Sequence, residues 1–139
     1  IDKLGNRLGF DAVTRFEPED SWLPDRSFRQ TPATIAASGA DAWPTPPAPR
    51  PLTLLAKPLP VDAESDSADA LGPPLTLKRH GARRAVRFAD GPERITPEWR
   101  EQDADWPSHR DYWRVEDEAG ERLWLYRQDD RWFLHGFFA

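Results

Sequence analysis

The segments that decide the fold are Tyr112-Trp113-Arg114-Val115-Glu116, Arg122-Leu123-Trp124-Leu125-Tyr126-Arg127 and Arg131-Trp132-Phe133-Leu134-His135-Gly136-Phe137-Phe138. Apolar and polar side chains alternate along them, and aromatic and β-branched residues are frequent, which is typical of β-strands. The connections at 117–121 and 128–130 are short, and Gly120 can adopt a positive φ. The sequence therefore predicts a three-stranded antiparallel meander.

Both faces of this meander carry large apolar side chains. One face holds Trp113, Val115, Leu123 and Leu125, together with either Trp132 and Leu134 or Phe133 and Phe137; the opposite face holds Tyr112, Arg114, Trp124, Tyr126 and the rest of the last strand. A lone three-stranded sheet with two apolar faces is unstable in water, so we expect one face to pack on earlier strands. The other face also needs a cover, which could be the proline-rich segment, a helix at Trp99 or another protein.

Further elements are expected upstream. The pattern predicts a hairpin from runs 75–78 and 85–88 with a basic turn at 79–84, an edge strand at 51–61 bracketed by prolines, and a loop at 62–72. It also predicts a short helix at 2–9, a strand at 12–16, and a helical turn or two from Thr96 as N-cap. The fold class is thus mainly β: a small antiparallel sheet or partly open barrel, built from the hairpin and the meander, with one or two short helices.

Composition divides the chain of 139 residues into three parts. Residues 1–30 are nearly neutral, residues 31–50 are a proline-rich linker, and residues 51–139 form a β-rich domain. Trp43 is a large side chain within the linker and could dock on a neighbouring surface. Because the chain begins with Ile1 and contains no methionine, we expect it to be a piece of a longer protein.

The sequence offers no recognisable catalytic or metal-binding constellation. Its three histidines, His80, His109 and His135, are far apart and lack ligand spacing, and we expect His80 to be exposed in a turn and His135 to be a satisfied sheet residue. Cysteine is absent, which excludes thiolate chemistry and disulfides. No segment is apolar enough to cross a bilayer, and no signal peptide is evident. We therefore expect a cytoplasmic protein that is not an enzyme and holds no cofactor.

Two kinds of binding remain open. The aromatic surplus favours a protein interface, for which the candidate residues are Trp113, Trp124, Tyr126, Trp132, Phe133 and Phe137. About half of the aromatic residues could instead simply form the core. The alternative is a DNA-binding module, in which the basic hairpin supplies Lys78, Arg79, Arg83 and Arg84 to phosphates while aromatic rings stack on bases. The net charge of −5 argues against that alternative.

Several motifs resemble the end of ImuB proteins, which are bacterial homologues of Y-family DNA polymerases. They are the three strand segments above with Arg110-Asp111 before them, Gly91-Pro92-Glu93-Arg94-Ile95-Thr96-Pro97-Glu98-Trp99, Arg50-Pro51-Leu52-Thr53-Leu54-Leu55, Asn6-Arg7-Leu8-Gly9, Val13-Thr14-Arg15, and Ser21-Trp22-Leu23-Pro24-Asp25-Arg26-Ser27-Phe28. By this resemblance, residues 1–30 correspond to the junction after the polymerase-like region, and residues 51–139 to a C-terminal interaction domain.

The resemblance implies a non-catalytic adapter of translesion synthesis in the SOS response to DNA damage. Its partners would be a RecA-like ImuA-type protein, an error-prone C-family DNA polymerase and the sliding clamp. The chain contains no glutamine-led clamp-binding motif, so clamp contact is expected in an upstream region outside it. The resemblance also implies a bacterial cytoplasmic location, at the nucleoid during repair. A weaker possibility is that the chain only completes the fold of the upstream region and does not fold alone.

Overall fold

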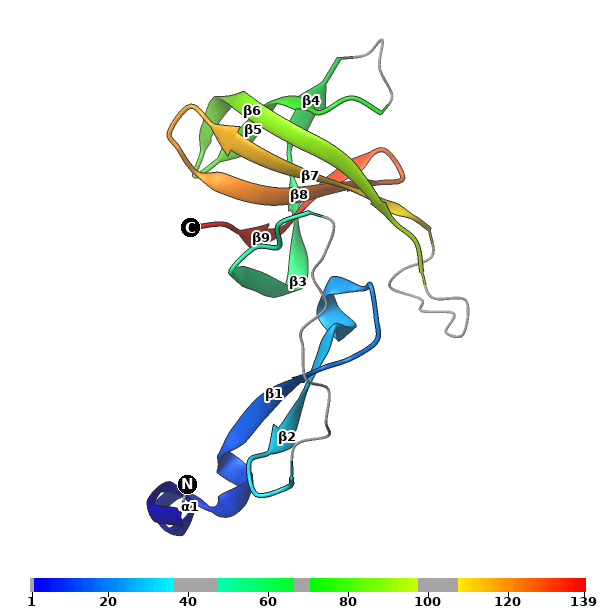
Figure 1. Ribbon diagram of the computed structural model, residues 1–139. Helices are drawn as coiled ribbons and strands as arrows, with labels where there is room; N and C mark the ends of the chain where they lie inside the picture. The colour runs from blue at the N-terminus through cyan, green and yellow to red at the C-terminus, as the bar shows by residue number, and fades with distance from the viewer. Residues whose placement is uncertain (1, 37–47, 67–70, 98–107) are drawn as a thin grey trace. The chain divides into compact units, whose positions relative to one another are not determined.

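A computed structural model describes residues 2–36, 48–66, 71–97 and 108–139 of the chain. The chain divides into two compact units, Ile1–Pro47 and Ala48–Ala139, and each is described by itself. Figure 1 labels the α-helix and the β-strands of both units. The predicted docking of Trp43 and the body of the helix predicted after Thr96 fall outside the described residues.

The first unit contains a short helix and a two-stranded sheet. Helix α1 (Asp2–Leu8) is the one predicted near the N-terminus, and it ends where Gly9 adopts a φ of 91°. A 3-10 turn, η1 (Phe10–Ala12), leads into β1 (Thr14–Pro18), which pairs antiparallel with β2 (Phe28–Pro32). A second 3-10 turn, η2 (Pro24–Arg26), lies between the two strands.

Opposite faces of this small sheet differ in chemistry. Phe16 and Phe28 form an edge-to-face pair with centroids 5.3 Å apart, and both rings are exposed. On the other face the buried carboxylate of Glu17 lies 2.8 Å from Arg15 and 3.3 Å from Arg29. The strand predicted at 12–16 corresponds to β1, which begins two residues later, at Thr14. The sequence did not predict β2, whose last two residues, Thr31 and Pro32, are the first two of the predicted linker.

The second unit is a seven-stranded antiparallel sheet. Its strands are β3 (Thr53–Val61), β4 (Ala63–Ser65), β5 (Pro74–Arg79), β6 (Ala82–Ile95), β7 (Arg110–Asp117), β8 (Arg122–Gln128) and β9 (Arg131–Phe137), in the spatial order β3-β9-β8-β7-β6-β5-β4. The last three strands are the predicted meander. The mainly β fold class expected from the sequence is confirmed, as is the edge position of β3.

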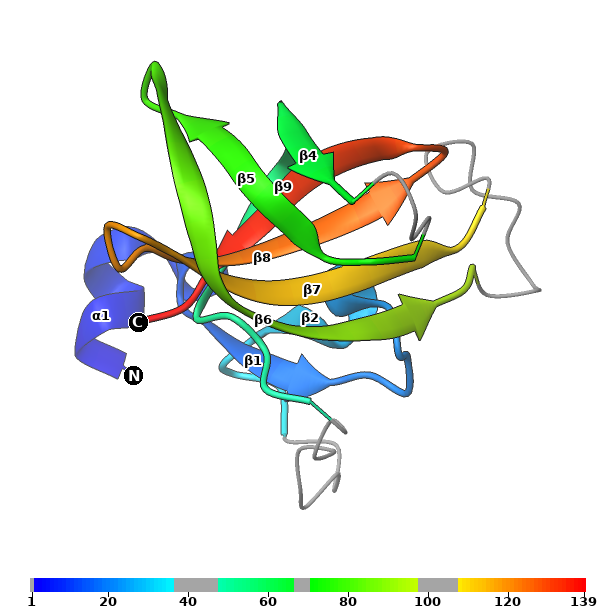
Figure 2. The same cartoon turned by 90° about the horizontal axis from the view of Figure 1, so that it is seen from above.

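The sheet is curled into a half-barrel (Figure 2). Its two edge strands, β3 and β4, are consecutive in the chain and are separated by Asp62 alone. Strand β3 pairs with β9, whereas β4 pairs with β5, and Lys78 N donates a hydrogen bond to Asp62 O at 2.8 Å. The continuous stretch 53–65 therefore supplies both edge strands of the sheet, and the sheet must curl to bring its two edges to this one stretch.

Two tight turns hold neighbouring strands together. His80 and Gly81 join β5 to β6 with φ values of 50° and 79°, and Asp129 and Asp130 join β8 to β9 with φ values of 49° and 61°. Paired positive φ values match the right-handed twist of a hairpin, and Asp tolerates this conformation better than most residues. The first turn is therefore tighter than the predicted basic turn at 79–84, and both of its neighbouring strands are longer than expected.

The core lies on the concave side of the sheet. Its buried members are Leu77, Trp113, Val115, Leu123, Leu125, Trp132 and Leu134. Leu55, Val61, Ala63, Val86 and Ala89 pack against them from the earlier strands, so the expectation that one face of the meander packs on the hairpin and the edge strand is confirmed. The prediction of a loop at 62–72 is wrong for residues 63–65. These residues form β4, because their backbone pairs with that of β5.

Candidate functional site

The convex side of the meander carries a second set of rings, which we name the outer aromatic cluster: Tyr112, Trp124, Tyr126, Phe133 and His135. The centroids of Tyr112 and Trp124 lie 4.1 Å apart in a stacked arrangement, and Tyr126 stacks on Phe133 at 5.0 Å. The hydroxyl of Tyr112 lies 2.8 Å from Nδ1 of His135, and both side chains are fully buried. His135 is therefore the satisfied sheet histidine that the sequence predicted.

Guanidinium groups lie over this cluster. Those of Arg50, Arg110 and Arg131 are 5.2 Å from the centroid of Trp124, 4.5 Å from that of Tyr126 and 5.3 Å from that of Phe133, respectively. Cations over aromatic faces are attracted by the ring quadrupole. Arg50 also forms a two-pronged ion pair with the carboxylate of Glu93. The convex face is thus partly covered by arginine side chains; Arg50 belongs to the predicted proline-rich segment, one of the three covers considered, whereas the sequence did not indicate Arg110 and Arg131.

The predicted interface residues differ in accessibility. Trp113, Trp124, Tyr126 and Trp132 keep only 2–6% of their surface exposed, whereas Phe133 and Phe137 are half-buried. Trp113 and Trp132 face the core, and Phe137 packs against it. The exposed aromatic surface is therefore smaller than the sequence predicted, because packing covers rings on both faces of the meander. Alternation alone does not reveal which rings are covered.

The basic residues of the β5–β6 hairpin are largely paired with acids. Arg84 donates to Asp117 at 2.9 Å and to Glu121 at 2.8 Å, Arg79 lies 3.6 Å from Glu121, and Arg83 is paired with Glu64. The side chain of Lys78 is exposed and has no ion-pair partner among the described residues. The hairpin therefore presents far less unneutralised positive charge than its sequence suggests, and DNA binding through it stays a prediction.

Asp117 is the central acceptor of this network. Its Oδ1 accepts hydrogen bonds from the backbone N–H groups of Ala119 and Glu121, each at 2.9 Å, while Oδ2 accepts from Arg84. Burial raises the pKa of Asp117, but the bond from Arg84 and the two backbone donors outweigh burial and hold the pKa below its ordinary value. The hydrogen bond from Arg84 to Asp117 and the negative charges of Asp117 and Glu121 raise the pKa of Arg84. The network joins the β5–β6 hairpin to the β7–β8 turn.

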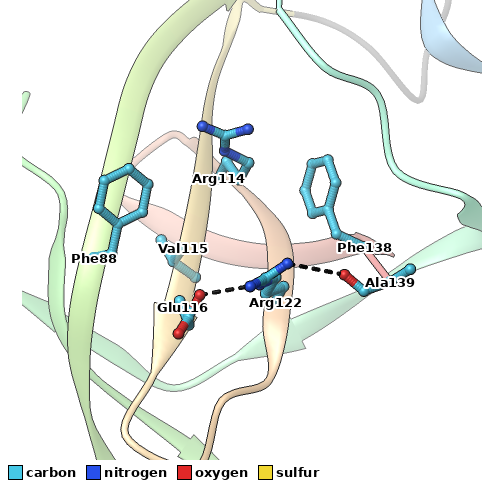
Figure 3. Close-up of a pocket in the computed structure, with 7 residues that line it drawn as sticks. All are labelled: Phe88, Arg114, Val115, Glu116, Arg122, Phe138 and Ala139. Carbon is cyan, nitrogen blue, oxygen red and sulfur yellow. Dashed lines mark hydrogen bonds and ion pairs between the residues drawn. The ribbon is translucent and has the colours of Figure 1, made fainter.

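A pocket of about 340 Å³ opens on the convex side of β6, β7 and β8. We name it the two-phenylalanine pocket; its lining residues are Phe88, Arg114, Val115, Glu116, Arg122, Phe138 and Ala139. In Figure 3 the rings of Phe88 and Phe138 stand on opposite sides of it with Arg114 between them. The sequence reasoning missed this pocket, because only the register that pairs Phe88 with Glu116 brings its walls together.

The described residues hold no cluster of metal-ligand type. No group of three or more His, Asp or Glu side chains that could hold a metal ion occurs in the described ranges. His80 is exposed in the β5–β6 turn, as expected, and His109 lies 3.7 Å from Asp111. Among the helices that the structure describes, none has the length and apolar character required to cross a membrane.

Comparison with known proteins gives a match along the whole chain. It is 36% identical over 151 aligned residues to Protein ImuB of Caulobacter vibrioides, in strains NA1000 / CB15N and ATCC 19089 / CIP 103742 alike, and the match covers 100% of this chain and 32% of each relative. The chain thus spans about a third of the length of the curated relatives it matches. No family model and no solved structure matches. The comparison confirms the resemblance read from the sequence: this chain is homologous over its whole length to a part of ImuB, consistent with a C-terminal region of that family.

Proposed function

We propose that this chain is a non-catalytic protein-interaction module of an adapter in damage-induced mutagenesis. Its docking partner is a RecA-like protein, an error-prone C-family DNA polymerase, or both. The observation that carries this proposal is the identity of 36% to ImuB, which extends over the entire chain. The sliding clamp is bound through a region outside this chain, since no glutamine-led motif occurs within it.

The surface chemistry of the second unit supports an interaction role. Its aromatic residues fill two packed layers, and arginines lie over the rings of the outer one. Half-buried aromatic side chains beside arginines are the kind of residue that dominates protein interfaces. Phe133 combines both features, since it is half-buried, stacks on Tyr126 and has Arg131 over its ring.

The pairing of charges favours a protein partner over DNA. Electrostatic binding to DNA depends on Lys and Arg side chains that are free to neutralise phosphates and so release the counterions condensed on the DNA. In the β5–β6 hairpin, Arg79, Arg83 and Arg84 already face carboxylates of this chain. The charge of −5 adds a further repulsion toward a polyanion.

Isothermal titration of the 139-residue chain with each purified partner tests the proposal. We expect saturable binding to at least one partner, with a Kd of about 1 μM or tighter and a weak dependence on salt. Phe133→Ala should weaken binding, whereas Leu75→Ala, at an exposed position on β5, should not. Trp124→Ala is a poor test because that ring is buried against Tyr112, so its loss would disturb the sheet.

A parallel titration with fluorescein-labelled single-stranded DNA distinguishes the alternative. DNA binding that falls steeply with salt and is abolished by changing Arg83 and Arg84 to Glu, with no binding to either protein, would replace the proposed function with a DNA-binding one.

A further inference from the structure

The two-phenylalanine pocket has aromatic walls and a rim that carries arginine side chains. Phe88 is 51% exposed, and Phe138 on the opposite wall is half-buried. Between them, Val115 of β7 forms part of the lining. The volume of about 340 Å³ lies at the lower end of the range of small-ligand sites, about 300 to 1,000 Å³, and suits a single planar group. A ring inserted here would have an aromatic neighbour on each side.

Two guanidinium groups supply the polar rim. Arg114 donates to Asp90 at 2.9 Å and lies 5.8 Å from the centroid of Phe88. Arg122 donates through Nε to Glu116 at 3.0 Å and through Nη1 to the backbone oxygen of Ala139 at 3.3 Å. A guanidinium offers five N–H donors, so both side chains keep donors for an added acceptor. Because these ion pairs are on the surface, a second carboxylate can join or replace the present ones at small cost.

The occupant must therefore combine a planar apolar group with hydrogen-bond acceptors. A nucleotide has this combination, but its phosphate would be placed near Glu116 and Asp90, each of which already neutralises one of the two arginines. A protein segment lessens this repulsion, because a single carboxylate carries less negative charge than a nucleotide phosphate and backbone carbonyls carry none, and both can use the spare N–H donors. Aromatic anchors in pockets with polar rims are the usual hot spots of protein interfaces.

We propose that the two-phenylalanine pocket receives an aromatic side chain of a partner protein, from a segment that carries a carboxylate next to that side chain. The aromatic ring lies between Phe88 and Phe138, and the carboxylate accepts from Arg114 or Arg122. This rests on the proposed function, to which it adds the docking position and the chemistry of the docked segment.

The first experiment tests the pocket without any partner protein. The ¹⁵N-labelled 139-residue chain is titrated with the peptide acetyl-Asp-Trp-Asp-amide, with acetyl-Asp-Ala-Asp-amide and with thymidine monophosphate. We expect saturable shifts of the amides of Val115, Glu116 and Arg122 with the tryptophan peptide alone. Phe88→Ala should weaken this binding at least about fivefold, whereas the matched exposed control Leu75→Ala should leave it unchanged. If Phe88→Ala fails to fold, Phe138→Ala provides the same test.

Two results of this titration overturn the proposal. One is the absence of pocket shifts with the tryptophan peptide, or shifts that persist unchanged in both phenylalanine variants. The other is stronger binding of thymidine monophosphate at the same amides, which would assign the pocket to a nucleotide.

The second experiment repeats the partner titrations with Phe88→Ala, for which we expect at least about a tenfold loss of affinity. Unchanged affinity for a partner that binds the native chain would refute the pocket as the docking position and leave the proposed function intact. If neither partner binds the native chain while the tryptophan peptide still occupies the pocket, the proposed function fails. The inference that the pocket binds an aromatic side chain next to a carboxylate is then retained.

Discussion

Replacing Asp117 should reveal how strongly the β7–β8 turn is tied to the β5–β6 hairpin. The buried carboxylate accepts three hydrogen bonds, of which two come from backbone N–H groups and one comes from Arg84. Bonds to a charged group contribute about 1.5 to 3 kcal/mol each, but Arg84 keeps Glu121 as a partner and water can reach the exposed turn. We therefore expect Asp117→Ala to lower the free energy of unfolding by about 2 to 4 kcal/mol.

Asp117→Asn separates the backbone bonds from the ion pair. The amide oxygen can still accept from the N–H groups of Ala119 and Glu121, whereas the amide nitrogen is a donor and cannot accept from Arg84. The expected loss is about 1 to 2 kcal/mol. Glu118→Gln, which removes one charge from the neighbouring exposed position, is the matched control and should stay within about 0.5 kcal/mol of the native chain.

Urea unfolding followed by tryptophan fluorescence measures these differences. With a denaturant slope of about 2 kcal/mol per molar, the midpoint for Asp117→Ala should fall by about 1 to 2 M. Because the folded state lowers the pKa of this carboxyl, its contribution to stability is complete above about pH 4, the ordinary range for Asp, and is lost as pH falls through the folded pKa. The difference in the free energy of unfolding between the native chain and Asp117→Asn should therefore become smaller below about pH 4. A gap of under about 0.5 kcal/mol at pH 7, or one that does not change with pH, would refute this account.

Three further substitutions test other parts of the structure by thermal and urea unfolding. Leu77→Ala should lower the free energy of unfolding by about 2 to 5 kcal/mol, because Leu77 is fully buried in the core; a loss below about 1 kcal/mol would contradict its place there. Gly136→Ala should destabilise by about 1 to 3 kcal/mol, since a Cβ would lie 2.7 Å from the backbone oxygen of Thr53; native stability would mean that β3 and β9 are farther apart. Tyr112→Phe should lose about 1 to 2 kcal/mol because it leaves Nδ1 of buried His135 without this partner, and an unchanged midpoint would show that the bond contributes nothing.

The meander could be predicted because its signals are local. Alternation placed Trp113 and Val115 on one face and Tyr112 and Trp124 on the other, and the structure confirms both sets. For the last strand the sequence left two choices, and the core contains Trp132 and Leu134. Phe137 also packs against the core because the register between β8 and β9 shifts at Trp124, which alternation cannot indicate.

Elements that depend on long-range pairing could not be predicted. Residues 63–65 have little strand propensity of their own, and β4 exists only because β5 lies beside it. The same limit applies to the two-phenylalanine pocket. Phe88 and Glu116 are brought together by the register of β6 and β7, which the sequence of either strand does not specify.

The origin of β3 and β4 in one stretch has a consequence for folding during synthesis. Strand β3 is among the first parts of the second unit to leave the ribosome, yet its pairing partner β9 is the last strand of that unit to emerge. A nascent chain can form the β5–β6 hairpin early, but it cannot close the sheet until β9 has left the exit tunnel. Such long-range closure gives a high contact order and slow folding, so arrested nascent chains that lack β9 should remain sensitive to protease.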